Sequence, residues 1–404
     1  MEAVKLVVVF VIIVIALRRK ISVGLTLFAA GVITALLHGL NLIQLLESYW
    51  SLIKSQRFIS LTAIVMLITL LGSLLKELKF LDKLTSACYL LPGGSRTAAT
   101  ILPGFVGLMP MPGGSLLSAP LVDNVLSQQK KSPEFKLLTN YWFRHITEFS
   151  WPIYPGLVLT EGLTGMPVYK VALLQAPLTV VMFVIGLVFL SRKMEVSNRG
   201  QTNVFRALAG VLSTIWPIAL AITLYGLLKI DLALAVLISL IVLVMVARPE
   251  RQMLTNAFKS GVSFQLAFLV FGILSFQTVL ELTGAIESIP TLAISLNLPA
   301  EIVIFAVCFA AGILTGMVAA FVGLGYSLLA GYLYQPEIVP SHILLAYLSG
   351  FLGIILSPTH LCLVLTNEYF GSNLLTVYRK MIIPLLIMLA LGLMLYFSPW
   401  PGFF

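Results

Sequence analysis

The most polar stretch inside any apolar segment of this chain is Tyr141-Trp-Phe-Arg144-His145-Ile-Thr-Glu148. Arg144 and Glu148 stand one helical turn apart and can form an ion pair, which lowers the cost of burying either charge. Glu148 is therefore the first candidate for a protonatable coupling group, with Arg144 as its partner or as an anion-binding charge and His145 beside them. A purely structural ion pair, or an Arg144 side chain that extends to the nearest aqueous surface, is the alternative.

Glycine and proline interrupt four apolar runs, at residues 109–115, 150–156, 323–327 and 357–360. Each break would expose N–H groups at the start of a helix, which suit a carboxylate or oxyanion, and carbonyls that suit a sodium ion at the hairpin tips. The alternative is that these residues only kink or pack helices. The breaks predict these substrate-binding residues: Pro112, Gly113, Gly114, Ser115, Pro152, Tyr154, Gly323, Gly325, Ser327, Ser357, Pro358, Thr359 and His360.

His360 titrates near neutrality, so it is either a ligand or proton carrier or a satisfied buried histidine. The cysteines Cys88, Cys308 and Cys362 have no CxxC spacing and lie in or beside apolar segments. We expect them to be small hydrophobic residues, with no disulfide framework and no zinc site. Apart from a coupling proton or sodium ion, no metal or cofactor is predicted.

The elements that must position these residues are membrane-spanning helices. The chain has 404 residues, of which 59% are hydrophobic and only 10% charged, far below the roughly 25% charged of a soluble domain. Apolar runs of about 20 residues, enough to cross a bilayer, recur along the chain. About ten transmembrane helices are predicted, at 5–17, 22–45, 58–75, 138–160, 167–191, 205–228, 231–247, 261–282, 342–365 and 374–397.

Two longer apolar stretches, 97–126 and 300–334, are interrupted in the middle and are predicted to be re-entrant hairpins. Most basic residues then fall in loops on one side, which the positive-inside rule makes the cytoplasmic side and which places both termini outside. This explains the net charge of +9 without nucleic-acid binding. No targeting segment or phosphate-binding loop is apparent, so we expect a multi-pass protein of the prokaryotic cytoplasmic (inner) membrane that does not use ATP.

An internal repeat organises these elements. Residues 152–160 match 358–366 at one constant offset, and residues 113–118 match 325–330 at a slightly different one. The units are 1–195 and 203–404, joined by a cytoplasmic linker at 196–202. Each unit holds five spans and a hairpin, and since five is odd the units form an inverted repeat. Inverted repeats with interrupted helices are a sequence-level indication of a secondary transporter.

With its two hairpins and its broken spans at 138–160 and 342–365, the chain resembles the ion transporter superfamily of citrate, dicarboxylate, gluconate and arsenite carriers, and most closely an uncharacterised ten-span family within it. The resemblance implies a scaffold part, a moving transport part, a homodimer and anion transport driven by sodium ions or protons. It also implies that Gly113, Gly114 and Ser115, with Gly325 and Ser327, bind at the hairpin tips. The chain departs from the Ser-Asn-Thr hairpin signature of the dicarboxylate branch, so neither a dicarboxylate nor the usual sodium site is assigned.

The first hypothesis is a secondary active transporter that moves a small anion, an organic acid or an oxyanion, by alternating access coupled to H+ or Na+. The runner-up is a cation/proton antiporter in which Glu148 and His360 handle protons. An intramembrane serine hydrolase using Ser115 or Ser327 with His360 lacks an acidic orienting residue, and a channel lacks a filter-like carbonyl run. We therefore expect a carrier, not an enzyme, with a small molecule or ion and the lipid bilayer as its partners.

Overall fold

The computed structural model describes residues 2–88, 90–92, 94–108, 114–196 and 203–404, and these ranges form helices and their connections. The helices of the first half are α1 (Glu2–Arg18), α2 (Val23–Leu37), α3 (Leu42–Lys54), α4 (Gln56–Glu77), α5 (Phe80–Cys88), α6 (Gly94–Gly107), α7 (Ser115–Leu126), α8 (Pro133–His145), the 3₁₀ helix η1 (Ile146–Phe149), α9 (Pro155–Thr164), α10 (Val168–Phe189) and η2 (Ser191–Lys193).

The helices of the second half are α11 (Val204–Gly226), α12 (Leu232–Ala247), α13 (Arg251–Gly261), α14 (Phe264–Leu282), η3 (Ala285–Glu287), α15 (Ser288–Ser295), α16 (Ala300–Thr315), α17 (Val318–Phe321), the π-helix η4 (Val322–Tyr326), α18 (Ala330–Leu333), α19 (Pro340–Leu356), α20 (Leu361–Phe370), α21 (Leu374–Tyr396) and η5 (Trp400–Phe403).

Six helical segments among the described residues are long and apolar enough to cross a membrane, and five of them contain α4, α10, α11, α14 and α21. The sixth, Pro340–Phe370, runs through α19 and α20 across the break between them. Shorter apolar helices such as α2, α12 and α16 accompany these six. An all-helical chain with this composition has the pattern of a membrane protein. The number of ten crossings and the re-entrant course of the hairpins stay predictions.

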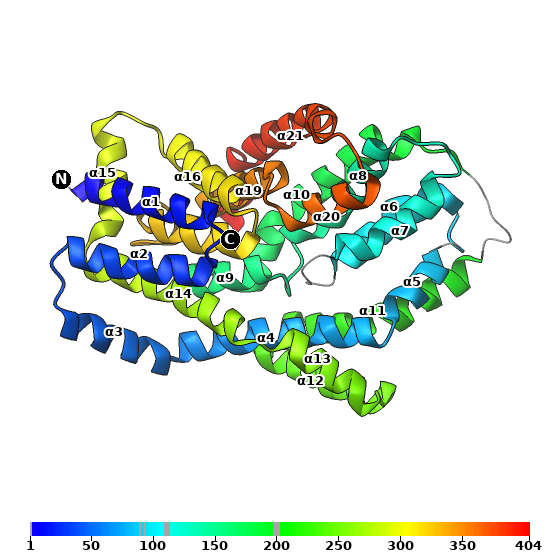
Figure 1. Ribbon diagram of the computed structural model, residues 1–404, viewed down its shortest axis with the longest axis horizontal. Helices are drawn as coiled ribbons and strands as arrows, with labels where there is room; N and C mark the ends of the chain where they lie inside the picture. The colour runs from blue at the N-terminus through cyan, green and yellow to red at the C-terminus, as the bar shows by residue number, and fades with distance from the viewer. Residues whose placement is uncertain (1, 89, 93, 109–113, 197–202) are drawn as a thin grey trace.

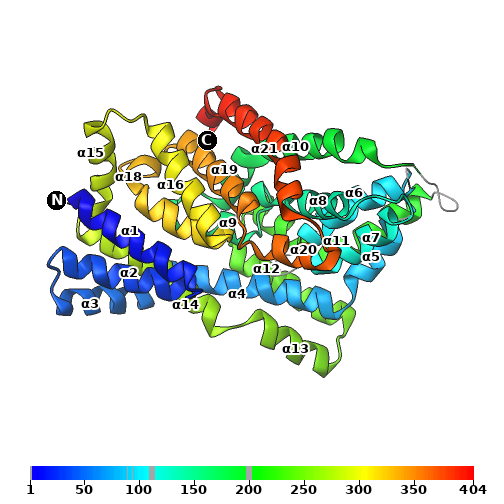
Figure 2. The same cartoon turned by 45° about the horizontal axis from the view of Figure 1, so that its top comes forward.

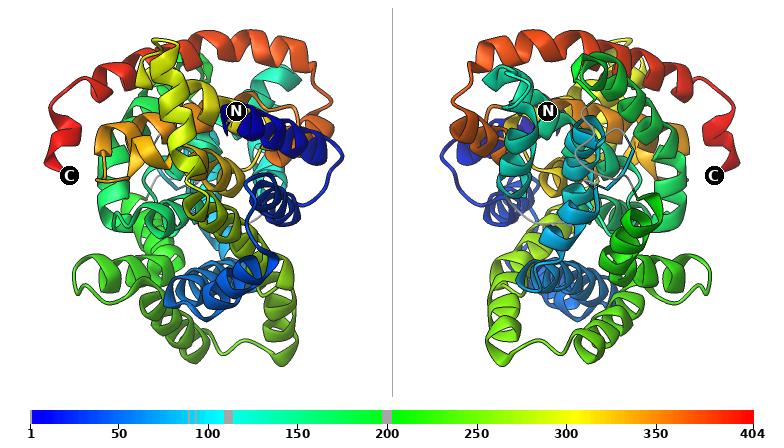
Figure 3. Two further views of the ribbon diagram at one scale, coloured as in Figure 1. Left: turned by 90° about the vertical axis from the view of Figure 1, so that its left-hand side faces the viewer. Right: turned by 90° about the vertical axis from the view of Figure 1, so that its right-hand side faces the viewer.

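The helices form two groups that draw on both halves of the chain (Figures 1 and 2). In the first group α2 packs on α14, and α4 packs on α12 and α13. In the second group α6, α7 and α8 pack together, α16 and α21 pack on α19, and α20 packs on α7 and α8. Viewed along the long axis, α4, α12 and α13 lie at the bottom and α21 at the top (Figure 3).

The helix boundaries recur along the chain at a nearly constant distance. Helix α9 begins at Pro155 and α20 at Leu361, which is 206 positions later (361 − 155), and α6 and α16 begin at Gly94 and Ala300, also 206 apart (300 − 94). Both α9 and α20 end on a glycine in the left-handed conformation, Gly165 and Gly371. The recurrence extends the sequence match at 152–160 to whole elements, while the exact unit boundaries and the inverted orientation stay predictions.

Three predicted segments differ from the structure. The span predicted at 22–45 ends at Leu37, because Gly39 adopts a positive φ and Asn41 caps the separate helix α3. The break predicted at 323–327 is helical, since Val322–Tyr326 form a π-helix that continues from α17. The interruption of the second hairpin lies instead at Gly316, which ends α16 with a φ of 61°. The pairing of 113–118 with 325–330 stays a prediction, since Gly113 lies outside the described residues.

Glycine lets the first arm of each hairpin approach the broken helix beside it. A Cβ atom on Gly107 in α6 would overlap the carbonyl group of Arg144 in α8, and one on Gly312 in α16 would overlap the carbonyl group of Gly350 in α19. Arg144 and Gly350 are themselves 206 positions apart (350 − 144). Each hairpin arm therefore meets its broken helix at an equivalent backbone position.

We expect Gly312→Ala to lower the melting temperature of the purified protein, because the added methyl group forces α16 and α19 apart and overpacking costs about 1–3 kcal/mol. Gly226→Ala is the matched control, since a Cβ there has no neighbouring atom within 4 Å. Equal melting temperatures for the two variants would contradict the close contact between α16 and α19.

Candidate functional site

Two broken helices bring the polar side chains together in the middle of the molecule. Helix α8 ends at His145, continues as the 3₁₀ turn η1, and α9 restarts at Pro155, whose fixed φ and missing N–H suit the first position of a helix. Helix α19 ends at Leu356, before Ser357-Pro358, because a residue that precedes proline disfavours helical backbone. The first turn of α20 packs against α7 and α8, so residues from both halves of the chain meet there (Figure 1).

Arg144 and Glu148 form the buried ion pair that their spacing predicts. Arg144 Nη1 lies 3.3 Å from Glu148 Oε1, and the two side chains are 2% and 4% exposed. The hydroxyl group of Tyr154 donates a hydrogen bond to the same carboxylate oxygen, and Arg144 Nη1 also lies 3.4 Å from the Tyr154 oxygen. Because a buried charge is costly without partners, these contacts stabilise the carboxylate and the guanidinium together.

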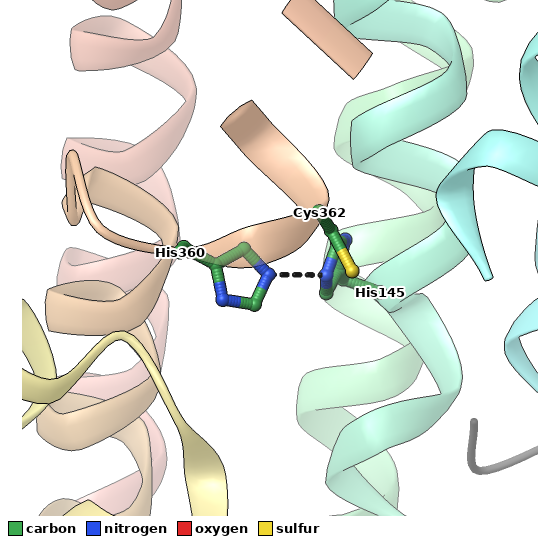
Figure 4. A group of neighbouring side chains, drawn as sticks. All are labelled: His145, His360 and Cys362. Atoms are coloured by element: carbon green, nitrogen blue, oxygen red, sulfur yellow. Dashed lines mark hydrogen bonds between the residues drawn. The ribbon is translucent and has the colours of Figure 1, made fainter. Parts of the chain in front are cut away.

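His145 and His360 face each other through their Nε2 atoms, which lie 3.0 Å apart (Figure 4). The Nδ1 atom of each ring lies 2.6 Å from a backbone carbonyl oxygen, that of Tyr141 for His145 and that of Gly316 for His360. A carbonyl oxygen only accepts, so each Nδ1 carries a hydrogen atom, and in two neutral rings both Nε2 atoms would present lone pairs to each other. A cation between the rings, either a proton or a metal ion, removes this repulsion.

Cys362 completes the group. Its Sγ atom and one imidazole nitrogen each from His145 and His360 lie within 4.8 Å of one another, and the three residues are buried (Figure 4). The prediction that Cys362 is only a small hydrophobic residue is therefore incomplete. Two imidazoles and a thiol are a donor set that binds metal ions. Cys88 and Cys308 are buried free thiols outside this group.

Tyrosines from the two halves bridge the broken helices almost reciprocally. The hydroxyl group of Tyr347 on α19 donates to the carbonyl oxygen of Glu148 at 3.0 Å, and that of Tyr141 on α8 donates to the carbonyl oxygen of Ile355 at 3.1 Å. Both residues are fully buried. Because Glu148 lies where helical hydrogen bonding ends, Tyr347 supplies a donor to a carbonyl group that the break leaves free.

The hairpin residue Ser115 also reaches this region. Its hydroxyl group donates to the carbonyl oxygen of Cys362 at 3.3 Å, and Asn140 donates to the Ser115 carbonyl oxygen at 3.0 Å. The N-terminus of α7, with Gly114 as its N-cap, therefore lies beside the N-terminus of α20. The Ser115 hydroxyl group is hydrogen-bonded to a backbone carbonyl oxygen rather than to a histidine. A serine nucleophile would instead be hydrogen-bonded to its general base.

The remaining predicted residues lie elsewhere. Ser327 donates to Gly323 within its own helix, Gly325 packs against Cys308, and neither glycine provides the open backbone that was predicted. Ser357 donates to the carbonyl oxygen of Ile313 and pairs with Thr359. Both Pro358 and Thr359 are exposed, and Pro152 is half-buried in the turn before α9. Pro112 and Gly113 lie outside the described residues.

Sequence reasoning missed Cys362, Tyr347 and Asn140 as members of this region. Cys362 follows His360 by two positions in the first turn after a break, and that closeness to a predicted site residue was the available signal. For Tyr347 the signal was its repeat partner Tyr141, which lies one turn before His145. Nothing in the sequence indicates that His145 and His360, 215 positions apart, would meet.

Two cavities border the α8–α9 segment and share no lining residue. One, of about 980 Å³, is lined by the C-terminal end of α9 with Arg57, Gln277, Glu281 and Tyr334. The other, of about 620 Å³, is lined by Leu138 and Trp142 of α8 together with five basic side chains. These are Lys130, Lys131, Lys193, Arg379 and Lys380. The buried group consists of Arg144, His145, Glu148, Tyr154, His360 and Cys362. The first four of these residues lie along the chain between the parts of α8 and α9 that border the two cavities.

The fold and site define a class of protein: its described residues form helices, six helical segments are long and apolar enough to cross a membrane, and a buried polar group lies at two helix breaks. Residues 2–398 match the family described as "Protein of unknown function (DUF401)", and the chain belongs to this family. No curated protein matches the chain.

Single substitutions within the buried ion pair should destabilise the protein more than the double substitution. Arg144→Met leaves the Glu148 charge uncompensated, which costs about 3–5 kcal/mol in comparable buried pairs, whereas Arg144→Met with Glu148→Leu removes both charges. Thermal unfolding in detergent measures the difference. The Lys136–Asp123 pair, whose side chains are 15% and 35% exposed, is the control because exposed pairs contribute about 0–1 kcal/mol. Additive losses at Arg144 and Glu148 would contradict the coupling.

Proposed function

We propose that this protein is a secondary active transporter of a small anion, driven by a proton or sodium gradient. The observation that carries the proposal is the charge of the buried group. Arg144 and Glu148 balance each other, and a cation held between His145 and His360 would add a positive charge. Because a net charge in a low-dielectric interior is costly, a bound anion that restores neutrality is stabilised there.

Helix ends support the choice of an anion. The first N–H groups of a helix have no partner within the helix and carry the positive end of its dipole. The N-termini of α7 and α20 lie side by side at Ser115 and Cys362, and α9 begins directly after Tyr154, which contacts Glu148. Three such ends around one buried group favour a carboxylate or an oxyanion over a cation as the transported species.

The two helix groups support an alternating-access mechanism. In this proposal α1–α4 and α11–α14 form the scaffold, and α6–α10 with α16–α21 form the moving transport part. The cavities beside α8 and α9 are the two access routes, and rocking of the transport part would open them in turn. The recurrence of helix boundaries supports two repeated units, and an odd number of spans in each unit would make them inverted.

The resemblance to the ion transporter superfamily supports a homodimer, and the distribution of basic residues supports a protein of the prokaryotic cytoplasmic membrane with both termini outside. Glu148 is the proposed coupling residue, since its Oε1 atom lies 3.8 Å from His145 Nε2 and its Oε2 atom finds no hydrogen-bond partner among the described residues. The anion site itself depends on Arg144 and the helix ends and does not require the histidines to change protonation.

Purified protein reconstituted in liposomes should accumulate a labelled anion in response to an imposed proton or sodium gradient. A panel of organic acids and oxyanions, chosen by a ligand-stabilisation screen, supplies the substrates. Uptake should saturate with substrate concentration, because each transport cycle moves a bound ion. Gradient-independent flux would indicate a channel, and proton-linked movement of cations would indicate an antiporter.

Arg144→Gln should reduce anion uptake at least about tenfold, because the loss of one charge-assisted contact costs about 1.5–3 kcal/mol. Lys136→Gln is the matched control, since Lys136 is a basic residue of the same helix whose partner Asp123 lies away from the buried group. Glu148→Gln should retain exchange of anion across the membrane but lose its response to the gradient. Unchanged uptake in Arg144→Gln, with the protein folded, would contradict the assigned anion site.

A further inference from the structure

We propose that His145, His360 and Cys362 form a binding site for a soft transition-metal cation, with Zn²⁺ as the ion that fits best. Imidazole nitrogen and thiolate sulfur are the donors that zinc prefers in proteins, and sodium or magnesium would take oxygen donors instead. The three donor atoms converge from the end of α8 and the start of α20 (Figure 4). This site goes beyond the proposed transport and does not depend on it.

The distances fit a metal ion after a small adjustment. In a tetrahedral zinc site two imidazole nitrogens lie about 3.3 Å apart and nitrogen and sulfur lie about 3.5 Å apart, given Zn–N near 2.0 Å and Zn–S near 2.3 Å. The Nε2 atoms of His145 and His360 are 3.0 Å apart, and no separation among the three donor atoms exceeds 4.8 Å. Rotation of the Cys362 side chain can close the difference.

In both histidines, the ring nitrogen that faces away from the proposed metal makes the hydrogen bond that is typical of a metal-binding histidine. A ligating histidine usually donates its other ring N–H to a carbonyl or carboxylate oxygen, which fixes the tautomer and orients the ring. His145 and His360 each do so through Nδ1, to the carbonyl oxygens of Tyr141 and Gly316. Both Nε2 lone pairs therefore point at one place before any ion arrives.

Glu148 can supply a fourth ligand and part of the negative charge that balances the metal ion. Glu148 Oε1 lies 3.8 Å from His145 Nε2, and its buried Oε2 atom has no hydrogen-bond partner among the described residues. When the ion binds, the Cys362 thiol loses its proton to solvent, and the thiolate together with the Glu148 carboxylate neutralises the two positive charges of Zn²⁺. Arg144 then supplies the remaining positive charge for an anion.

The side of the site nearest the surface is that of His360. This residue is 8% exposed, and the two preceding residues, Pro358 and Thr359, are exposed. In this proposal an ion enters from that side. The ligands come from both halves of the chain, so a bound ion would connect the two broken helices.

Cobalt is a suitable probe, because Co²⁺ accepts the same ligands as Zn²⁺ and absorbs visible light. The full-length protein, purified in detergent and freed of metal with a chelator, is titrated with Co²⁺. We expect the absorption of tetrahedral cobalt together with a sulfur-to-cobalt charge-transfer band, and both should disappear when Zn²⁺ is added. Cobalt binding without the charge-transfer band, or no binding by the folded protein, would overturn the proposal.

Variants test each ligand. Cys362→Ser should remove the charge-transfer band and weaken Co²⁺ binding by at least about tenfold, since even the loss of an outer contact costs 10–100-fold. Cys308→Ser and His342→Asn are the controls, because Cys308 packs against Gly325 and His342 Nδ1 contacts the carbonyl oxygen of Tyr332. The wild-type spectrum alone decides whether a thiolate ligates, so the test does not depend on how well Cys362→Ser folds. Transport assays give a separate readout, so the failure of one proposal is distinguishable from failure of the other.

Discussion

The main constraint on this molecule is the contact between the imidazole rings of His145 and His360. Both Nδ1 atoms donate to backbone carbonyl oxygens, and the two Nε2 atoms lie 3.0 Å apart. A cation between the rings removes the repulsion between the two Nε2 lone pairs, and the pair lies beside the buried ion pair of Arg144 and Glu148. Because hydrocarbon tolerates neither free backbone groups nor unbalanced charge, the surrounding helices must enclose this group and supply its counter-charges.

The broken helices meet this constraint by sharing their free backbone groups. Tyr347 donates to a carbonyl group at the break after α8, and Tyr141 donates to one at the end of α19, so each half stabilises the break of the other. The Cys362 carbonyl accepts from Ser115 at the start of α7. Both halves of the chain contribute to this polar centre, so it is stable only while the halves remain packed together. The packing of the helices around α8 and α19 therefore stabilises the charges that they enclose.

The sequence predicted the helical class, the breaks at 150–156 and 357–360, and the pairing of Arg144 with Glu148, because these depend on composition, on proline and on spacing within one helix. It did not predict that His145 and His360 would meet or that Cys362 would join them, since such contacts depend on how distant helices pack. The break predicted at 323–327 was wrong because glycines in an apolar run also permit a π-helix, and the turn at Gly316 carried no proline to indicate it.

The most direct measurement is the ¹⁵N chemical shift of the histidine Nε2 atoms, by solid-state NMR of the labelled protein in lipid bilayers. The chain has four histidines, and His38→Asn and His342→Asn variants identify the signals of the buried pair. The account predicts that at least one Nε2 atom of His145 or His360 has the shift of a protonated or metal-bound nitrogen. Two Nε2 signals with the shift of a free lone pair would contradict it.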